Sequence, residues 1–381
     1  MTRMYLIRHA EAEGNLYRRA QGHWDGKVTA LGKKQIDALE ARFRDIQIDA
    51  LYSSDLSRAV ETAGAVARGR GLEIVTMPQL REMCMGAWEG QSWGDIAWRW
   101  PEQMAYFNND PGKLSVPGGE SFSQLQARIG GALMGIAEKH DGQTVAVVTH
   151  GMAIRCFLCG VMGLCSADIG GVLHGDNTSV SLLEIADGKV RVLFYNDNSH
   201  LGETLSTFAR QKWWRKDAGT DYANLRFVPL DLKDKANAEL YRKSYADAWT
   251  ASHGSASGFV PGVYLAAARE HVRETPESLV KVMSGDHFAG VIELNPARGK
   301  KGGCGWISLF YLAPEFRGKG YGVQLLGYSA AFYFLRDRSC IRLHAAVTNH
   351  TAIAFYKKHG FREIAVEQGV SSDQLLMEKA I

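Results

Sequence analysis

The sequence has no long hydrophobic run and little cysteine, and each shortage argues against a class of protein. No apolar segment among the 381 residues reaches the roughly 18–20 residues that a membrane-spanning helix needs. The six cysteines are too few and too irregularly spaced for a disulfide scaffold. The first residues also lack the apolar stretch of a signal peptide. We therefore expect a cytoplasmic protein that is not embedded in a membrane.

An excess of charge of one sign is also missing. The chain has 44 Lys+Arg and 41 Asp+Glu, a net charge of +3, so we expect no nucleic-acid partner. The charge is unevenly distributed, however. Residues 1–208 hold 20 basic and 24 acidic residues (−4), and residues 209–381 hold 24 and 17 (+7). A basic C-terminal half suits an anionic ligand such as a nucleotide cofactor.

The chain is long enough for two or three domains, and its pattern changes near residue 205. Strand-like and helical segments alternate before that point, which predicts a three-layer α/β/α domain over residues 1–205. Residues 206–223 are charge-rich without a sustained period, so we interpret them as a linker, with Trp213 and Trp214 docking onto a domain face. Residues 224–381 are α+β in character and form the second predicted domain.

The expected elements follow hydrophobic periodicity. In the first domain we expect strands at 4–7, 48–52, 73–77, 144–149, 179–185 and 190–195, and helices at 29–44, 55–68 and 119–139. In the second we expect strands at 225–230, 280–283, 288–294, 306–312 and 341–347 with a final strand pair, and helices at 235–251, 263–273, 323–335 and 351–359. The apolar, β-branched run 144–149 is typical of a buried parallel strand.

Two histidines directly follow strands of the first predicted domain. Arg8 and His9 end the first strand, and Thr149, His150 and Gly151 end the buried one. A single histidine at a strand end is usually structural, but ligands of open α/β sheets bind at the carboxyl ends of the strands. A neutral imidazole there can attack phosphorus while Arg and His donors neutralise the transferring oxygens. The pair therefore favours phosphoryl transfer to a histidine nitrogen.

These residues carry a family resemblance. The segment LIRHAEAEGN at 6–15 resembles the opening signature of the histidine phosphatase superfamily, which includes the cofactor-dependent phosphoglycerate mutases. The agreement continues in order through VTALG (28–32), SSDLSRA (53–59), LREMCMGAWEG (80–90), PGGES (117–121) and VTHGM (148–152). It covers essentially the whole first domain and implies the three-layer α/β/α fold of that superfamily.

The resemblance also implies roles for single residues. His9 would be the nucleophile that becomes phosphohistidine, and Glu82 would protonate the leaving oxygen and later deprotonate the attacking water. One departure is Ala10, where the commonest motif has Gly. If that position required a positive φ, Ala would cost about 1 kcal/mol. The phosphate pocket that the resemblance implies consists of Arg8, Asn15, Arg58, His150 and Gly151.

Both a phosphatase and a phosphomutase fit these motifs. A mutase usually has an extra basic segment after the Glu82 block, whereas residues 91–117 are short, aromatic and poor in basic residues. This region resembles the phosphatase branch, notably the α-ribazole phosphatase-like members. We therefore favour hydrolysis of a small-molecule phosphomonoester. The aromatic residues would line the substrate pocket, which would suit an ester with an apolar or ring-bearing group. A phosphoglycerate mutase-like phosphomutase is the alternative.

Several residues near these motifs have two interpretations. Thr29 is expected to cap a helix, and Ser121 is either a helix start or a substrate contact. Trp88 is either a core residue or a pocket wall. Cys156 and Cys159 have the spacing of a metal or redox pair, but they lie in an apolar helix without a second pair, so we expect buried thiols and no metal.

The second domain contains a glycine-rich turn, APEFRGKGYG at 313–322, between an apolar strand and a helix. Small residues there let backbone N–H groups approach an anion at a helix N-terminus. Neither the Rossmann nor the Walker A glycine spacing is present. A tight turn without a ligand is the alternative interpretation.

This turn is similar to the acyl-CoA-binding motif of the GNAT acetyltransferases, and VTNHTAIAFYKKHGF at 347–361 resembles the segment that follows in that family. The resemblance implies a GNAT fold and acetyl-CoA as cofactor. Asn349 would contact the pantetheine region, and Tyr356 would protonate the departing thiolate unless it is a core aromatic. The pyrophosphate would be held by the turn's residues, namely Arg317, Gly318, Lys319, Gly320, Tyr321 and Gly322.

Few residues of the sequence indicate which amine would accept the acetyl group. Glu293, on the strand before the cofactor strand, is the best candidate for its base, although a surface role is equally compatible. We expect a bifunctional protein, a phosphohistidine-type phosphatase joined to an N-acetyltransferase that acts on a small amine or amino-acid-like acceptor. The alternative is a phosphatase with an inactive, CoA-sensing C-terminal module.

Overall fold

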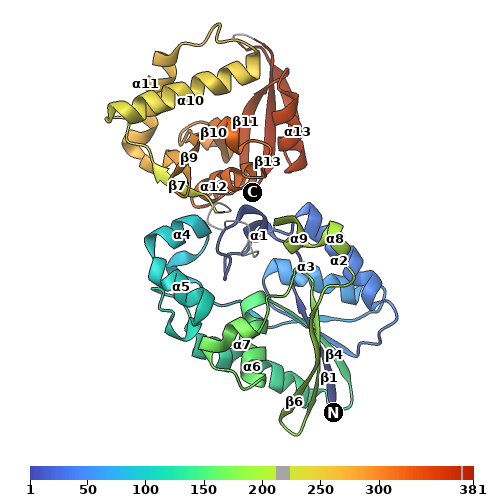
Figure 1. Cartoon of the computed structure of the whole chain (residues 1–381). Coiled ribbons are helices and arrows are strands. Elements are labelled where there is room, and N and C mark those ends of the chain that lie inside the picture. Colours follow the sequence, from blue (N-terminus) through green and yellow to red (C-terminus); the bar gives the residue numbers. More distant parts are fainter. Residues whose placement is uncertain (212–223, 370–371) are drawn as a thin grey trace. The chain divides into compact units, whose positions relative to one another are not determined.

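The computed structural model describes residues 1–211, 224–369 and 372–381. The chain divides into two compact units (Figure 1): Met1–Gln91 with Ile96–Thr220, and Ser92–Asp95 with Asp221–Ile381. None of the helices in these described residues is long and apolar enough to cross a membrane. The tryptophans expected to dock, Trp213 and Trp214, lie outside the described residues.

The first unit contains a six-stranded sheet in the order β3-β2-β4-β1-β5-β6. The first four strands of that order run parallel, and the last two are antiparallel to their neighbours. The strands are β1 (Thr2–Arg8), β2 (Ala50–Ser53), β3 (Ile74–Thr76), β4 (Thr144–Thr149), β5 (Val180–Ala186) and β6 (Lys189–Asp197).

Helices cover both faces of this sheet. In Figure 1, α2 and α3 lie on one side of β1 and β4, and α6 and α7 lie on the other. One core cluster joins apolar residues of α2 and α3 to strand residues, including Leu39, Val66 and Val148. The expected three-layer α/β/α fold is confirmed. The helices are α1 (Glu13–Tyr17), α2 (Ala30–Phe43), α3 (Ser57–Ala67), α4 (Trp93–Arg99), α5 (Pro101–Asn109), α6 (Phe122–Lys139), α7 (Gly151–Val161), α8 (Gly202–Leu205) and α9 (Thr207–Gln211).

Side-chain caps fix where two of these helices begin. The Thr29 hydroxyl accepts a hydrogen bond from the Gly32 N–H at the start of α2, as expected. Ser121 forms a capping box with Gln124 at the start of α6, which identifies it as a helix start. The sequence patterns did not predict α4 and α5, because the aromatic residues of 93–107 mask any helical period.

The segment expected to begin the linker is ordered secondary structure in its first residues. Ser206 and Thr207 are buried, and the Ser206 hydroxyl donates to Asp176. Residues 207–211 form α9, and Gln211 donates to the carbonyl of Asn15. The boundaries 1–205, 206–223 and 224–381 remain a prediction.

The second unit has a seven-stranded sheet in the order β12-β13-β11-β10-β9-β8-β7, in which β10 and β11 are the parallel pair. Its strands are β7 (Arg226–Pro229), β8 (Leu279–Ser284), β9 (His287–Leu294), β10 (Cys304–Leu312), β11 (Cys340–Ala346), β12 (Arg362–Glu367) and β13 (Gln374–Ala380). Its helices are α10 (Lys235–His253), α11 (Pro261–Glu274), α12 (Gly322–Phe334) and α13 (His350–Lys358).

The parallel pair separates part-way along its length. The pairing of β10 with β11 runs from Cys304 to Ile307, although β10 continues to Leu312. A register shift between Ile307 and Leu309 marks a bulge in the pairing of β10 with β9. Cys304 and Cys340 face each other at the paired end and form a disulfide, and the other four cysteines are free.

Candidate active site

His9 and His150 follow directly from paired strand ends. Arg8, the last residue of β1, is in register with Thr149, the last residue of β4. The parallel register therefore brings the next residues of both strands together, and the two imidazole rings lie with centroids 5.1 Å apart. Both side chains are buried, at 4% and 0% exposure. The sequence prediction that these two histidines share one site at the sheet edge agrees with this geometry.

The hydrogen bond of His9 fixes its tautomer. Nδ1 lies 2.7 Å from the carbonyl oxygen of Ala10, which can only accept, so Nδ1 carries the proton. Burial lowers the pKa of His9 well below its usual value, and the positive charges of Arg58 and Arg8 lower it further. The ring is therefore neutral near pH 7 and has its lone pair on Nε2. Ala10 itself does not have a positive φ, so the departure from Gly costs no backbone strain.

His150 has the opposite tautomer. Its Nδ1 lies 3.3 Å from Nη2 of Arg58, a pure donor, so Nδ1 accepts and Nε2 carries the proton. Burial first, and then Arg58 and His9, lower the pKa of His150 well below its usual value. Its buried Nε2 has no hydrogen-bond partner among the residues that the structure describes. A buried N–H without a partner costs free energy and suits an anionic acceptor.

Arg8 and Arg58 offer further buried donors. The Nε atoms of both are buried without a partner in the described parts of the chain. Burial lowers the pKa of Arg58 to about 10, so it stays protonated near pH 7. Arg8 donates through Nη1 to the carbonyl of Gly175, and a Cβ on Gly151 would lie 3.2 Å from Arg8 Nε. Glycine at 151 therefore leaves space for the Arg8 guanidinium.

Glu82 lies at the start of α7, the helix that follows His150. Its carboxylate oxygens accept the backbone N–H groups of Met152 and Ala153, at 3.0 Å each, and that of Met83 at 2.9 Å. A carboxylate at a helix N-terminus is stabilised by these donors and by the helix dipole. The strand end that carries His150 thus also orients Glu82.

Asn15 and an unpredicted residue, Asn177, lie beside the nucleophile. Asn177 is fully buried, and its Nδ2 donates to the carbonyl of His9 and, at 3.4 Å, to Oδ1 of Asn15. Its Oδ1 has no partner in the described chain. Asn177 lies in none of the sequence motifs, and it is 168 positions from His9 in the chain. The sequence therefore contains no indication that Asn177 lies at this site.

Glu89 is a second residue whose function the sequence did not predict. Its carboxylate accepts the N–H groups of His23 and Trp24, both at 2.8 Å. The carbonyls of Gly22 and Trp24 in this loop accept hydrogen bonds from Arg58. Glu89 therefore orients the loop that holds Arg58 against His150. A Cβ on Gly22 would lie 2.4 Å from the Glu89 carboxylate, which explains glycine there.

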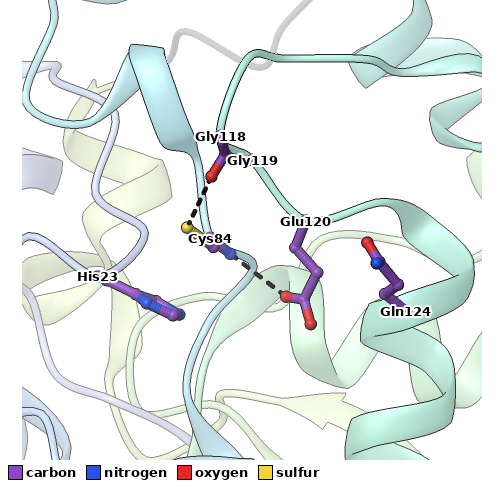
Figure 2. A pocket seen from close by; sticks show the side chains of 6 residues that line it. All are labelled: His23, Cys84, Gly118, Gly119, Glu120 and Gln124. Atoms are coloured by element: carbon purple, nitrogen blue, oxygen red, sulfur yellow. Dashed lines mark hydrogen bonds between the residues drawn. The ribbon is translucent and has the colours of Figure 1, made fainter.

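A pocket of about 350 Å³ opens at Cys84 (Figure 2). One lining residue, His23, contacts the backbone of Glu82, since its Nε2 lies 3.0 Å from the Glu82 backbone carbonyl oxygen. The pocket is lined by His23, Cys84, Gly118, Gly119, Glu120 and Gln124. This lining is polar and differs from the expected aromatic wall. Trp88 is instead a core residue, fully buried and packed against the rings of Trp100 and Phe107.

The glycine-rich turn of the second unit presents free backbone donors. The N–H groups of Gly318, Lys319, Gly320 and Tyr321 have no hydrogen-bond partner in the described residues. Gly318 and Gly320 have φ values of +72° and +86°, which glycine adopts without strain. The turn leads directly into α12, whose first residue, Gly322, packs against the ring of Phe355. An anion could therefore bind here through backbone amides.

The other C-terminal candidates have defined contacts. The Arg317 guanidinium donates to Asp247 and to the carbonyl of Leu312, so it is already engaged beside the turn. Asn349 caps α13 by accepting the N–H of Ala352. Tyr356 packs among the rings of Phe310, Phe355 and Phe361, and burial raises the pKa of its hydroxyl.

Glu293 is not on the surface. It is 2% exposed, and its carboxylate accepts from the Tyr241 hydroxyl at 2.7 Å and lies 2.9 Å from Nδ1 of His271. It is in register with Leu309, just beyond the last pair that joins β10 to β11. The Tyr241, His271 and Glu293 side chains thus form a buried polar cluster at the level where these strands separate.

Comparisons with known families match both units. Residues 4–198 match the histidine phosphatase superfamily (branch 1), and residues 238–361 match the acetyltransferase (GNAT) family. The first match spans about half of the chain. Both resemblances stated from the sequence are confirmed, as is the α+β GNAT fold of the second unit.

Known relatives cover the N-terminal half. A protein described as metal-independent phosphoserine phosphatase from Arabidopsis thaliana is 36% identical over 204 residues, 53% of this chain and 84% of the relative. One described as probable phosphoglycerate mutase GpmB from Yersinia pestis is 36% identical over 167 residues, 43% of this chain and 76% of the relative. The solved structure of YhfR from Bacillus stearothermophilus has a TM-score of 0.51 and 32% identity, and covers 52% of this chain and 99% of that one.

Proposed function

Because the chain belongs to the histidine phosphatase superfamily and also contains a segment of the acetyltransferase (GNAT) family, we propose that it is a bifunctional enzyme. The first unit would hydrolyse a phosphomonoester through a phosphohistidine, and the second would transfer an acetyl group from acetyl-CoA to an amine. The observation that carries the first activity is the buried pair His9 and His150, with opposite tautomers at adjacent strand ends.

The first half-reaction uses the Nε2 lone pair of His9. Nε2 attacks phosphorus, the bond from phosphorus to the ester oxygen breaks, and Glu82, which has to bind a proton before this step, gives that proton to the ester oxygen. The Nε2–H of His150 and the Nε–H groups of Arg8 and Arg58 stabilise the charge on the transferring oxygens. Their lack of other partners supports this assignment, because an anion would satisfy all three buried donors.

The second half-reaction releases phosphate. Glu82 accepts a proton from water, whose oxygen attacks phosphorus, and His9 leaves as a neutral imidazole. Asn15 and Gly151 complete the pocket, Asn15 as a further donor to phosphate and Gly151 as the space for Arg8. We favour water over a second alcohol as acceptor, since none of the described residues that line the pocket at Cys84 is a lysine or arginine that could hold an anionic mutase intermediate. The similarity to a probable phosphoglycerate mutase keeps phosphoryl transfer as the alternative.

In the second unit, the unpaired N–H groups of Gly318 to Tyr321 fit the pyrophosphate of CoA. Acetyl-CoA would supply the activated acetyl group. Lys319 and Gly322 complete the turn, and Asn349 orients α13 beside it. Arg317 would support the turn through Asp247 rather than bind the pyrophosphate.

Two further groups of this unit would handle protons. Tyr356 keeps its hydroxyl proton near neutral pH, because burial raises its pKa, and can donate it to a leaving thiolate. Glu293, through Nε2 of His271, would accept the proton of the incoming ammonium. We place both activities in the cytoplasm, where acetyl-CoA is available.

Turnover of p-nitrophenyl phosphate by the wild type and by His9→Ala tests the hydrolase. We expect turnover by the wild type and its loss in the variant, whereas retained turnover in a folded variant would refute the nucleophile. Incubation with acetyl-CoA and a panel of primary amines tests the transferase through CoA release. Binding of acetyl-CoA without transfer to any amine would instead favour the CoA-sensing alternative.

A further inference from the structure

We propose that Asn177 and Thr178 are positioning residues of the proposed hydrolase, which fix the backbone of His9 so that its Nε2 can attack phosphorus in line. The inference deepens the proposed function and rests on it. It starts from a strained residue in the segment 176–179, which directly precedes β5. Thr178 has a φ of +59°, in the left-handed region that glycine and asparagine favour.

This conformation is unusual for threonine. Five non-glycine residues of the described chain have a positive φ, and Thr178 is the one among them with a β-branched side chain. For such a side chain a left-handed backbone is strained. Thr178 is also fully buried. Strain of this kind persists only where the surrounding contacts over-determine the backbone, and it is frequent at active sites. The contacts of Thr178 therefore indicate what the strain serves.

The strained backbone contacts the nucleophile directly. The Thr178 N–H donates to the carbonyls of Arg8 and His9, at 3.1 and 3.3 Å. The Arg8 N–H donates in turn to the Ser179 carbonyl at 3.0 Å. Nδ2 of Asn177 donates to the same His9 carbonyl at 3.0 Å. A carbonyl oxygen has two lone pairs, so the segment 176–179 uses both acceptor sites of the His9 carbonyl.

The Thr178 side chain is held by a chain of oriented hydrogen bonds. Nη1 of Arg42, which can only donate, lies 3.1 Å from Nδ1 of His200, so Nε2 of His200 carries the proton. That Nε2 lies 3.1 Å from the Thr178 hydroxyl. The hydroxyl therefore accepts from His200 and donates to the Asn177 carbonyl at 2.7 Å. This chain fixes the residue whose backbone and neighbour contact His9.

The start of the segment is fixed separately. Asp176 is buried, and its carboxylate accepts the N–H of Asn177 at 2.8 Å. It also accepts hydrogen bonds from Nδ2 of Asn198 and from the Ser206 hydroxyl. The segment cannot relieve the strain at Thr178 by moving as a whole, because such a movement would break these bonds.

Asn177 also orients the side chain proposed as a phosphate donor. Oδ1 of Asn15 accepts the N–H of Ala12 at 3.0 Å and lies 3.4 Å from Nδ2 of Asn177. Both contacts use the amide oxygen, which assigns Nδ2 of Asn15 to the anion. One side chain thus contacts both the backbone of the nucleophile and a donor of the phosphate pocket.

The position of His9 matters most in the transition state. A displacement of about 1 Å at a reacting atom can lower a rate by about 10²-fold. We therefore expect the two positioning residues to raise kcat more than they strengthen ground-state binding. Two anions separate these effects. Vanadate can form a bond to Nε2 of His9 and imitates the transferring group, whereas inorganic phosphate binds through hydrogen bonds alone.

Inhibition of p-nitrophenyl phosphate turnover by the two anions tests the inference. Thr178→Val keeps the branched shape and removes the hydroxyl. We expect kcat to fall about 10–100-fold and the inhibition constant of vanadate to rise by a similar factor, while that of phosphate changes less than about twofold. The ratio of the phosphate constant to the vanadate constant should therefore fall. Thr178→Ser keeps the hydroxyl and should retain the wild-type ratio.

Thr2→Val is the matched control. Thr2 is a buried threonine at the opposite end of β1, and its hydroxyl donates to the carbonyls of Ala137 and His140. The control variant should lose stability and keep the wild-type ratio. Asn177→Ala removes a donor to the His9 carbonyl and should lower the ratio as Thr178→Val does. Any loosening of Asn15 in that variant weakens both anions alike and cancels in the ratio.

The possible outcomes are distinct. An unchanged ratio in folded Thr178→Val would overturn the inference and leave the hydrolase intact. An equal fall of the ratio in Thr2→Val would also overturn it, because loss of stability alone would then explain the effect. If Thr178→Val does not fold, Asn177→Ala decides in the same way. If the wild type does not hydrolyse p-nitrophenyl phosphate, the proposed hydrolase itself fails.

Discussion

Nη2 of Arg58 lies 3.3 Å from Nδ1 of His150, and this contact orients the buried imidazole that faces the nucleophile. Because the guanidinium can only donate, it fixes the proton of His150 on Nε2. Arg58 is itself held by the carbonyls of Gly22 and Trp24. The proposed phosphate pocket is thus oriented before any substrate arrives.

This contact predicts the effect of Arg58→Lys. Lysine keeps a positive charge but cannot reach both loop carbonyls and His150 at once. We expect kcat for p-nitrophenyl phosphate to fall by about 10²–10³-fold, as when one aligned donor is removed from a charged transition state. Arg68→Lys, at the exposed end of the same helix, should retain wild-type kcat. Near-normal kcat in Arg58→Lys would show that turnover does not require the simultaneous hydrogen bonds of the Arg58 guanidinium to the loop carbonyls and His150.

The buried histidines predict how stability depends on pH. His200 accepts from Arg42 at Nδ1, and burial lowers its pKa to about 4. The unfolded chain binds a proton at this residue below about pH 6.5, whereas the folded chain does so only below about 4. The free energy of unfolding should therefore fall as the pH falls from 6.5 towards 4, with a contribution from His200 on the order of 1 kcal/mol per pH unit.

Urea unfolding at pH 7, 6 and 5 measures this dependence. His200→Gln cannot titrate in this range, so its free energy of unfolding should decline less steeply than that of the wild type. His253→Gln changes a partly buried histidine of the second unit and serves for comparison. In this variant the free energy of unfolding of the first unit should depend on pH as it does in the wild type. Identical slopes in wild type and His200→Gln would contradict the assignment of His200 as a buried neutral base.

The nucleophile's surroundings predict that a chelator leaves hydrolysis unchanged. Arg8 and Arg58 are positively charged donors around the proposed phosphate position, and they would repel a metal ion there. Within the described residues, the one cluster of potential ligand atoms is Cys304, Cys340 and Glu378 in the second unit, and its two cysteines are joined in a disulfide. Turnover of p-nitrophenyl phosphate should therefore survive dialysis against EDTA. A loss that added metal restores would argue against a purely guanidinium-assisted mechanism.

The glycine turn predicts a selective loss of acetyl-CoA binding. Gly320 has a φ of +86°, and a Cβ added there would meet open space. Valine at this position would place its branched side chain next to the unpaired N–H groups of the turn. We expect Gly320→Val to weaken acetyl-CoA binding at least tenfold by calorimetry. Gly254→Val carries similar backbone strain at the end of α10, where φ is +77°, and should bind normally. Equal affinities in both variants would exclude the turn as the pyrophosphate site.

The sequence predicted the site where local pattern and strand topology agree. His9 and His150 could be predicted because each follows an apolar strand, and parallel strands end at the same edge of a sheet. Asn177 and Glu89 could not, because their contacts with the site join residues 66 to 168 positions apart and follow no local period.

Burial of polar side chains was equally hard to predict. Glu293 was as compatible with the surface as with a site, and only the packing of α10 and α11 encloses it with Tyr241 and His271. The aromatic residues after Glu82 suggested a ring-lined pocket. Trp100 and Phe107 instead pack on Trp88, and Trp98 is exposed. The dense aromatic pattern also concealed the helical period of α4 and α5.

Trapping of the covalent intermediate tests the central claim most directly. After a rapid quench of turnover in alkali, where phosphohistidine survives, mass spectrometry of the digested protein should find one phosphoryl group on His9. The phosphoryl group should be absent from His9→Ala and should decay with the rate of turnover in the wild type. A phosphoryl group on His150 or another side chain, or turnover without any phosphorylated protein, would contradict the account.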